Sequence, residues 1–420
     1  MKTMNVLSLF DGMSCGQQAL ERTGIKVENY FASEIDKYAI QVTMANYPTT
    51  QQLGSVINVD GYSLPKIDLL IGGSPCQSFS FAGKRKGMST KDETEILTLE
   101  HYLQLKSEGF EFEGQSYLFW EYMRLLNELR VKNPNLYFLL ENVEMGEKWE
   151  KVLSKAIGVN GIHINSALVS AQNRRRIYWT NIGLEPGGLF GDLESIIEQP
   201  KDKEILLKDI LENEVNEKYY LSNKVVSRFK EYKIKSNIIG TTAPDFRTIG
   251  QRDEVYDNIG KMGCLNATDY KQPKQIIVHN TMPRSSTTGK GGTGPLSRTD
   301  GKTYCLDTGN TNAVEIVGLT EVRTEEAKQI RRETGTNPKR AKELVERNDN
   351  KTGALLTSLT NDNLLKINNS RIRRLTPIEC ERLQTVADNY TNHVSDSQRY
   401  KMLGNGWTVD VIVHIFKYIK

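Results

Sequence analysis

A cysteine at the end of a predicted buried strand is the residue of this chain best suited to chemistry. Cys76 follows the apolar run over residues 67–74 and stands between Pro75 and Gln77. Open α/β sheets form their ligand sites at the carboxyl edge of the strands. A thiolate is a strong nucleophile, and loop cysteines near cations or helix ends ionise readily. A lone cysteine is more often a small core residue, so the groups that accompany Cys76 decide how it is interpreted.

Two other polar groups adjoin predicted strands. Glu141 and Asn142 follow a strand predicted over 136–140. Arginines at 174, 175 and 176 precede a strand predicted over 177–182. Taken alone, Glu141 could be a helix cap and the arginines a solvated strand edge. Together with a nucleophile, they could supply a proton donor and cationic hydrogen-bond donors.

A glycine-containing turn over residues 10–16 joins the first predicted strand to the first predicted helix. Such a turn lets the backbone approach a ligand, and the helix N-terminus favours an anionic group. Glu34 ends the second predicted strand, where a carboxylate can accept hydrogen bonds from ribose hydroxyls. The combination predicts a nucleoside cofactor, either a dinucleotide or S-adenosylmethionine. The turn lacks a full Gly-x-Gly-x-x-Gly, which counts against the dinucleotide.

The elements around these residues alternate in type over the first 185 positions. Periodicity predicts a strand over 6–10, a helix over 14–23 closed by Gly24, and a helix after Asp36 that Pro48 prevents from continuing. A helix over 117–131 and strands over 161–170 and 177–182 follow. We therefore predict an α/β fold with a doubly wound, mostly parallel sheet.

The middle of the chain has a different texture. Between about 186 and 370, periodicity fades and Gly, Thr, Asn and Lys become frequent. We interpret this segment as a second, smaller domain with long loops. Order returns near Arg373, and an amphipathic segment over 407–419 ends the chain. The predicted domains are thus 1–185 with 371–420, and 186–370.

Composition excludes several classes of protein. The net charge of +3 in 420 residues is ordinary for a globular protein, and no apolar run approaches the roughly 18 residues of a membrane helix. The five cysteines are scattered and never spaced Cys-x-x-Cys. This pattern predicts neither a disulfide framework nor a metal site. We therefore expect a cytoplasmic protein without membrane association. Separate basic spots, such as residues 84–86 and 174–176, would form a phosphate-binding track only if they adjoin a reactive centre.

In this order, the motifs closely resemble those of the DNA cytosine-5 methyltransferases of bacterial or phage type. The matching segments are Phe10-Asp11-Gly12 with Gly16, Glu34, Pro75-Cys76-Gln77, Leu118-Phe119, Glu141-Asn142-Val143, Gln172-Asn173-Arg174-Arg175-Arg176, Arg373-Arg374-Leu375-Thr376-Pro377 with Glu379, Arg382 and Gln384, and Gly404-Asn405-Gly406. The resemblance covers about 4–185 and 370–420. The middle segment has only the position and texture of a target recognition domain.

The resemblance implies a class I, Rossmann-like methyltransferase fold with a smaller DNA-recognition domain. It implies that S-adenosylmethionine methylates C5 of cytosine in a specific sequence of duplex DNA, leaving S-adenosylhomocysteine. Cys76 would add to C6 of a flipped-out base, Glu141 would donate to N3, Arg176 would hold O2, and Arg174 would steady the Cys76 loop. The implied cofactor-binding residues are Phe10, Asp11, Gly12, Ser14, Gly16, Glu34, Ile35, Ser55, Val56, Pro75, Leu118 and Asn405. The implied DNA-binding residues are Gln77, Ser80, Lys84, Arg85, Gln172 and Arg175.

Three departures from the family pattern are visible. Ser55 stands where the family usually has an acidic residue that contacts adenine, so adenine recognition is weaker or supplied differently. Residues 90–115 lengthen the loop after Cys76, with no assigned role. Gln384-Thr385-Val386 replaces the common Gln-Gly-Phe, which we expect to be a packing difference.

Three alternatives stay open. An RNA (tRNA) cytosine-5 methyltransferase shares the fold, but the long middle segment argues against it. A non-catalytic DNA-binding relative would not need the set of Cys76, Glu141 and Arg176. A nicotinamide-dependent oxidoreductase is disfavoured by the incomplete glycine pattern. We expect a monomer in the cytoplasm of a bacterial cell or phage-infected host. Whether a cognate restriction endonuclease acts separately beside it stays open.

Overall fold

The protein is described by a computed structural model. The described residues are 3–75, 95–112, 114–187, 192–220, 230–231, 238–241, 254–256, 261–265, 275–278, 315–323, 342–346, 365–368 and 371–420.

A seven-stranded sheet in the order β3-β2-β1-β4-β5-β8-β6 forms the centre of the predicted catalytic domain, residues 1–185 with 371–420, which we call the catalytic body. All neighbouring strands pair in parallel except at β8, which is antiparallel to both β5 and β6. The predicted doubly wound, mostly parallel sheet is therefore confirmed. The strands are β1 (Met4–Leu9), β2 (Val27–Ser33), β3 (Gln51–Gln52), β4 (Leu69–Gly73), β5 (Tyr137–Val143), β6 (Ile162–Asn165) and β8 (Arg175–Thr180).

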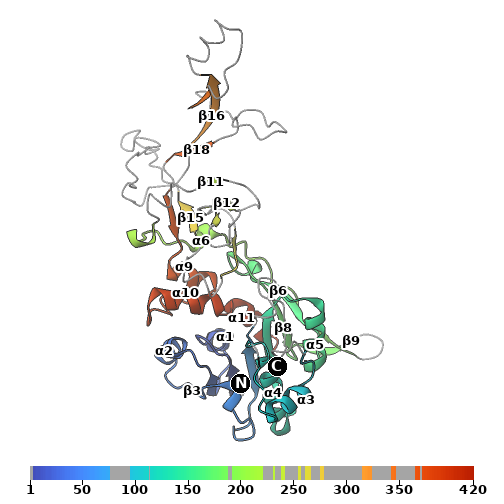
Figure 1. Cartoon of the computed structure of the whole chain (residues 1–420). Coiled ribbons are helices and arrows are strands. Elements are labelled where there is room, and N and C mark those ends of the chain that lie inside the picture. Colours follow the sequence, from blue (N-terminus) through green and yellow to red (C-terminus); the bar gives the residue numbers. More distant parts are fainter. Residues whose placement is uncertain are drawn as a thin grey trace.

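Helices cover both faces of this sheet (Figure 1). Alternate residues of the buried strands enter two separate hydrophobic clusters, as with Val6 in one and Leu7 in the other. The first cluster includes residues of α1, α2, α10 and α11, and the second includes residues of α3, α4 and α5. These helices are α1 (Cys15–Thr23), α2 (Lys37–Asn46), α3 (Leu99–Ser107), α4 (Leu118–Lys132), α5 (Glu147–Ile157), α10 (Asp396–Asn405) and α11 (Val409–Phe416).

The helix ends follow the signals in the sequence. Gly24 closes α1 with a left-handed φ of 71°, and its N–H donates to carbonyls of the last turn. The Asp36 carboxylate caps α2 by accepting from Tyr38 N–H. Helix α9 (Pro377–Leu383) begins with a capping box between Thr376 and Glu379.

One predicted strand is wrong. Residues 161–170 do not form a single strand, because β6 ends at Asn165 and a 3-10 turn (Ser166–Leu168) follows. The Asn165 side chain accepts from the backbone N–H groups of Ala167 and Arg174. These two hydrogen bonds turn the chain where apolar periodicity alone suggests that it continues.

The lengthened loop after Cys76 contributes α3, which packs against α4. Glu121 of α4 is fully buried and accepts hydrogen bonds from Tyr102 and from Lys106 of α3. Arg124 also binds Glu121, with 2.7 Å between Nε and Oε2. The described part of this insertion, residues 95–112 with 114 and 115, therefore includes a helix that packs against α4.

The middle segment contributes short strands beyond the catalytic body (Figure 1). They take part in a five-stranded sheet in the order β11-β12-β13-β15-β19, whose last strand belongs to the C-terminal segment, and in a three-stranded sheet in the order β17-β16-β18. In addition, β14 pairs with β7, which precedes the middle segment, and β9 and β10 form a hairpin that Figure 1 shows away from these sheets. Ile197, Leu207 and Ile210 pack into the same hydrophobic cluster as α11. The limits of the two domains stay a prediction. The segments are β7 (Gln172–Asn173), β9 (Leu184–Gly187), β10 (Asp192–Ser195), α6 (Leu207–Ile210), β11 (Lys230–Glu231), β12 (Ile238–Thr241), β13 (Glu254–Tyr256), β14 (Met262–Gly263), β15 (Gln275–Val278), β16 (Glu315–Arg323), β17 (Lys342–Glu346), β18 (Leu365–Asn368) and β19 (Arg371–Arg374).

Candidate active site

A cavity of about 810 Å³ opens at the carboxyl edge of the parallel strands. Its wall contains the ends of β1, β2, β4 and β5, the start of α4 and the end of α10. Ten of the twelve residues predicted to bind the cofactor line it: Phe10, Asp11, Gly12, Glu34, Ile35, Ser55, Val56, Pro75, Leu118 and Asn405.

The other two predicted cofactor residues serve the packing of the turn. Ser14 is fully buried in a left-handed conformation at the N-terminus of α1. At Gly16, an added Cβ would lie 2.4 Å from Ile71 Cδ1. Gly16 therefore allows α1 to approach the sheet, which holds the preceding turn at the cavity.

Glu34 is fixed in position by the backbone around it. Its Oε2 accepts from Gly12 N–H at 2.8 Å. Its Oε1 accepts from the N–H groups of Ile35 and Asp36, at 2.7 and 2.8 Å. Gly12 has a φ of 58°, so a residue without Cβ suits this turn. The result is a carboxylate in a single orientation beside the cavity, with further lone pairs for hydroxyl groups.

Asp11 is an acidic residue of the cavity wall whose pKa is shifted by its surroundings. Its Oδ1 accepts from the Tyr30 hydroxyl at 2.8 Å. Its Oδ2 is buried and has no hydrogen-bond partner among the described residues. Burial raises the pKa of Asp11 to about 6, and the charge of Glu34 adds to this shift. A cation in the cavity would stabilise the ionised form of Asp11.

Ser55 and Val56 line another part of the cavity. Arg124 fixes this turn, because its Nη2 donates to the carbonyl oxygens of Val56 and Val59 at 3.2 and 2.9 Å. Ile35 also lines the cavity and is 71% exposed. An exposed isoleucine and a serine in the same cavity wall offer an apolar surface and a hydroxyl to a planar ring.

Glu141 and Arg176, both predicted to be catalytic, form an ion pair in the cavity wall, and we call this pair and its neighbours the predicted catalytic corner. The distance from Arg176 Nε to Glu141 Oε1 is 2.8 Å, and the two side chains are 14% and 10% exposed. The Trp407 indole N–H donates to the other carboxylate oxygen at 3.3 Å. Gly73 is the register partner of Glu141, and an added Cβ there would lie 2.9 Å from Trp407 Nε1. Gly73 thus leaves room for the indole to reach Glu141.

Arg174 is almost completely buried behind this corner, with 3% exposure. Its guanidinium donates to Cys264 Sγ at 3.1 Å, to the carbonyl oxygens of Leu265 and Gly404, and to that of Gly406 at 2.9 Å. Arg174 therefore joins the middle segment to the C-terminal segment. Its predicted contact with the Cys76 loop involves residues outside the described ones.

The predicted nucleophile and most predicted DNA contacts also fall outside the described residues: Cys76, Gln77, Ser80, Lys84 and Arg85. Pro75, directly before Cys76, lines the cavity together with Glu141 and Arg176.

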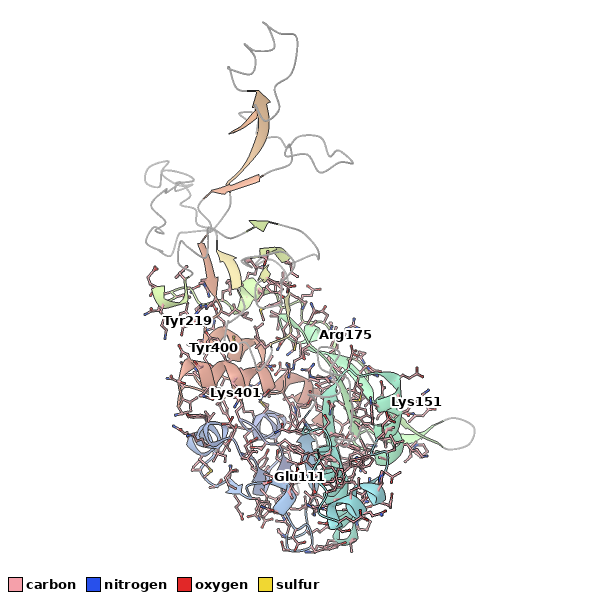
Figure 2. The ribbon with its side chains drawn as sticks, in the orientation of Figure 1. Glu111, Lys151, Arg175, Tyr219, Tyr400 and Lys401 are labelled. Atoms are coloured by element: carbon pink, nitrogen blue, oxygen red, sulfur yellow. The ribbon has the colours of Figure 1, made fainter. Side chains whose placement is uncertain are left out.

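The two described residues predicted to contact DNA lie in different environments. Gln172 is fully buried, and its amide donates to Leu383 O and Gln384 Oε1. This placement gives Gln172 a packing role and offers no support for a DNA contact. Arg175 has a side chain that is 68% exposed, near the end of the body at which the middle segment begins (Figure 2). Its DNA contact stays a prediction.

Sequence reasoning missed two residues of the corner, Trp407 and Cys264. Trp407 directly follows Gly404-Asn405-Gly406, so its place beside that motif was an available signal. Cys264 lies in a stretch without periodicity, and nothing in the local sequence indicates that it meets two arginines.

Comparison with known proteins identifies the class. The profile of the C-5 cytosine-specific DNA methylases matches residues 4–420. The orphan methyltransferase M.SPRI of Bacillus phage SPR is 28% identical, over 99% of this chain and 97% of that protein. The type II methyltransferase M.BanI of Aneurinibacillus aneurinilyticus is 26% identical, over 99% and 95% of the two chains.

Solved structures agree on the fold. The Entamoeba histolytica methyltransferase EhMeth matches with a TM-score of 0.53 and 13% identity, over 100% of this chain and 98% of that one. The Dnmt2 methyltransferase of S. pombe matches with a TM-score of 0.50 and 14% identity, over 99% and 98%. The fold is thus the class I methyltransferase fold. The chain belongs to the C-5 cytosine-specific DNA methylase family.

The described residues offer neither a metal site nor a membrane-spanning helix. They contain no group of three or more His, Cys, Asp or Glu that could hold a metal ion. In that same part of the chain, no helix is long and apolar enough to cross a membrane.

Proposed function

We propose that this protein is a DNA (cytosine-5-)-methyltransferase that modifies cytosine within a specific duplex DNA sequence, using S-adenosylmethionine and leaving S-adenosylhomocysteine. One observation carries the proposal. A single cavity is lined both by the turn and carboxylate suited to a nucleoside and by Pro75, Glu141 and Arg176.

The residues of the cavity fit S-adenosylmethionine. Glu34, held by three backbone N–H groups, can accept the ribose hydroxyls. The carboxylate of Asp11, whose Oδ2 has no hydrogen-bond partner among the described residues, suits a cofactor with cationic sulfonium and ammonium groups. Ile35 and Ser55 can contact the adenine, and Asn405 closes the cavity from α10. When bound, S-adenosylmethionine supplies a methyl group on an electron-deficient sulfur.

The chemistry at the cytosine assigns a role to each catalytic residue. The Cys76 thiolate adds to C6, which makes C5 nucleophilic enough to take the methyl group. Glu141, protonated or sharing a proton, donates to N3 and withdraws electrons from C6. Arg176 holds O2 of the base and the carboxylate of Glu141. After methyl transfer a base removes the C5 proton, the C6–S bond breaks, and Cys76 leaves as thiolate.

The target base must leave the duplex stack to enter this cavity. We propose that residues 186–370 select the DNA sequence, while 1–185 with 371–420 perform the chemistry. Arg175, with Lys84 and Arg85, would contact phosphates without reading bases. A cognate restriction endonuclease would act as a separate protein.

Tritiated S-adenosylmethionine tests the substrate class. The full-length protein is incubated with duplex DNA or with tRNA, and the labelled base is identified. Label on C5 of cytosine in DNA supports the proposal, whereas label in tRNA alone or in neither would contradict it. Grafting residues 186–370 into a relative with another target tests the division of labour, because the hybrid should acquire the recognition sequence of this protein.

A further inference from the structure

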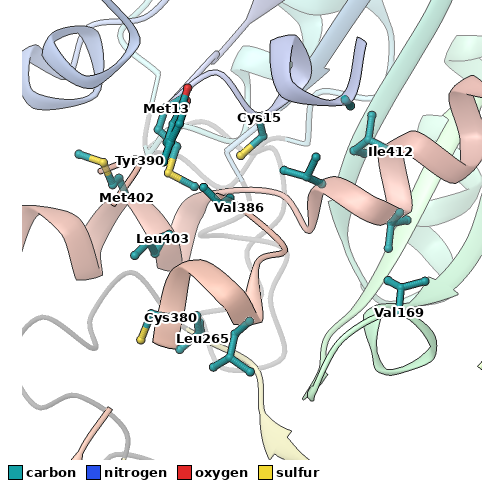
Figure 3. Close-up of a cluster of buried hydrophobic side chains, with 14 of the residues drawn as sticks. Met13, Cys15, Val169, Leu265, Cys380, Val386, Tyr390, Met402, Leu403 and Ile412 are labelled. Atoms are coloured by element: carbon teal, nitrogen blue, oxygen red, sulfur yellow. The ribbon is translucent and has the colours of Figure 1, made fainter. Parts of the chain in front are cut away.

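Cys264 brings the middle segment of the chain to the predicted catalytic corner. It follows β14, which pairs in parallel with β7 next to the catalytic arginines. Leu265 N–H donates to Gln172 Oε1 at 3.3 Å, and the Leu265 side chain belongs to the same buried cluster as Cys380 of α9 (Figure 3). Cys264 is therefore anchored to the catalytic body through both of its neighbours.

The sulfur of Cys264 lies against two guanidinium groups. Arg174 Nη1 is 3.1 Å from Sγ, and Arg176 Nη2 is 3.8 Å from it. Arg176 also binds Glu141 through Nε, and its Nη1 donates to the Arg175 carbonyl at 2.8 Å. A chain of contacts therefore runs from Arg174 through the sulfur to Arg176 and on to Glu141.

Electrostatics gives this sulfur a function. Arg174 and Arg176 carry like charges in a partly buried site, and they repel each other. The carboxylate of Glu141 balances the positive charge of Arg176. Apart from Cys264, the acceptors of Arg174 in the described chain are backbone carbonyl oxygens, which carry no full charge. Among the described residues, Arg174 and Arg176 bring positive charge to Cys264, and together they hold the pKa of its thiol below the usual value despite burial. A polarisable sulfur that accepts from both guanidinium groups reduces the repulsion.

We propose that Cys264 is a positioning residue of the methyl-transfer reaction: its sulfur holds Arg174 and Arg176 together, so that Arg176 stays aligned on Glu141. The inference rests on the proposed function and extends it, because a residue outside the catalytic motifs sets the geometry of the catalytic arginine. Without the sulfur, Arg176 loses one of its anchors and its guanidinium can rotate away from the carboxylate.

Single-turnover methyl transfer tests this role with saturating S-adenosylmethionine and duplex DNA. Cys264→Ala should lower the rate about tenfold, with dissociation constants for DNA and S-adenosylmethionine within about twofold of the unmodified protein. Cys264→Ser should recover to within about threefold, because a hydroxyl oxygen still accepts from both guanidinium groups. Cys380→Ala is the matched control, since it removes a buried sulfur from α9, and it should keep the rate within about twofold.

Either of two results would overturn the proposal: a Cys264→Ala rate within about twofold of the unmodified protein, or a Cys264→Ser rate as low as that of Cys264→Ala. A second measurement needs no methylation activity. Iodoacetamide alkylation of the full-length protein against pH, followed by peptide mass spectrometry, should give Cys264 a midpoint below 9.0. Cys15, for which burial raises the pKa to about 12, is the internal reference. A Cys264 midpoint at or above 9.0 refutes the proposed contact of its sulfur with the two arginines. A midpoint below 9.0 in a protein that does not methylate DNA refutes only the proposed function.

Discussion

Arg176 Nε lies 2.8 Å from Oε1 of Glu141, and the Trp407 indole binds the opposite oxygen of the same carboxylate. The carboxylate is thus held from both sides, by one residue of β8 and one of the C-terminal segment. Such fixed orientation is what a group needs to act on one atom of a bound base.

Replacing Arg176 should impair the reaction more than replacing its neighbour. Arg176→Lys leaves a point charge that cannot bind Glu141 and the Arg175 carbonyl at once. We expect a single-turnover methyl-transfer rate about 10- to 100-fold lower at saturating DNA. Arg175→Lys, one residue away with an exposed side chain, is the control and should leave this rate nearly unchanged. Equal losses in both variants would argue against a role for the Glu141 pair.

Gly73→Ala should impair methyl transfer through crowding. The added Cβ would lie 2.9 Å from Trp407 Nε1 and 3.0 Å from Glu141 Oε2, closer than ordinary contacts. We expect about a tenfold lower rate as the indole moves off the carboxylate. Gly146→Ala is the matched control, because an added Cβ there meets nothing within 4 Å. An unchanged rate in Gly73→Ala would show that the position of the indole does not matter.

Glu34→Ala should weaken binding of S-adenosylmethionine by about 1.5–3 kcal/mol, the usual loss for hydrogen bonds to a charged group. The reason is its position, since three backbone N–H groups point its carboxylate along the cavity. Isothermal titration calorimetry measures the change, with Glu28→Ala on β2, the strand that precedes Glu34, as control. Unchanged affinity in the Glu34 variant would remove it from the cofactor site.

Affinity for S-adenosylmethionine should increase as the pH rises through 6. Burial raises the pKa of Asp11 to about 6 in the unliganded protein, and the cationic cofactor favours the ionised form. Binding therefore releases a proton below pH 6, and calorimetry from pH 5 to 7 should show up to about a tenfold increase in affinity. Asp11→Asn should flatten this increase; a slope that persists in the variant would exclude Asp11 as its source.

Asp11 also makes the stability of the unliganded protein depend on pH. Its pKa in the folded state lies above the unfolded value of 3.8, so the folded state binds more protons in this range. The contribution of Asp11 to stability is present below pH 3.8 and is lost as the pH rises to about 6.

The sequence predicts those parts of the site that depend on local signals. The residue 10–12 turn and Glu34 each follow a strand, and Glu141 lies near the carboxyl end of β5. Parallel strands bring their carboxyl ends to one edge of the sheet. Arg174, Gln172 and Cys264 could not be placed in this way. Their environments depend on contacts across long sequence separations, such as that between Gln172 and Gln384. The break after Asn165 was missed because side-chain hydrogen bonds, which periodicity does not detect, turn the chain there.

Covalent trapping tests the central claim most directly. Duplex DNA carrying 5-fluorocytosine at the target is incubated with the protein and S-adenosylmethionine, and the product is examined by denaturing gel and peptide mass spectrometry. Because fluorine cannot leave as the C5 proton does, the Cys76 thioether at C6 should persist. We predict a DNA adduct on the peptide that contains Cys76, absent in Cys76→Ser and retained in Cys380→Ala. An adduct that forms equally in Cys76→Ser would contradict the account.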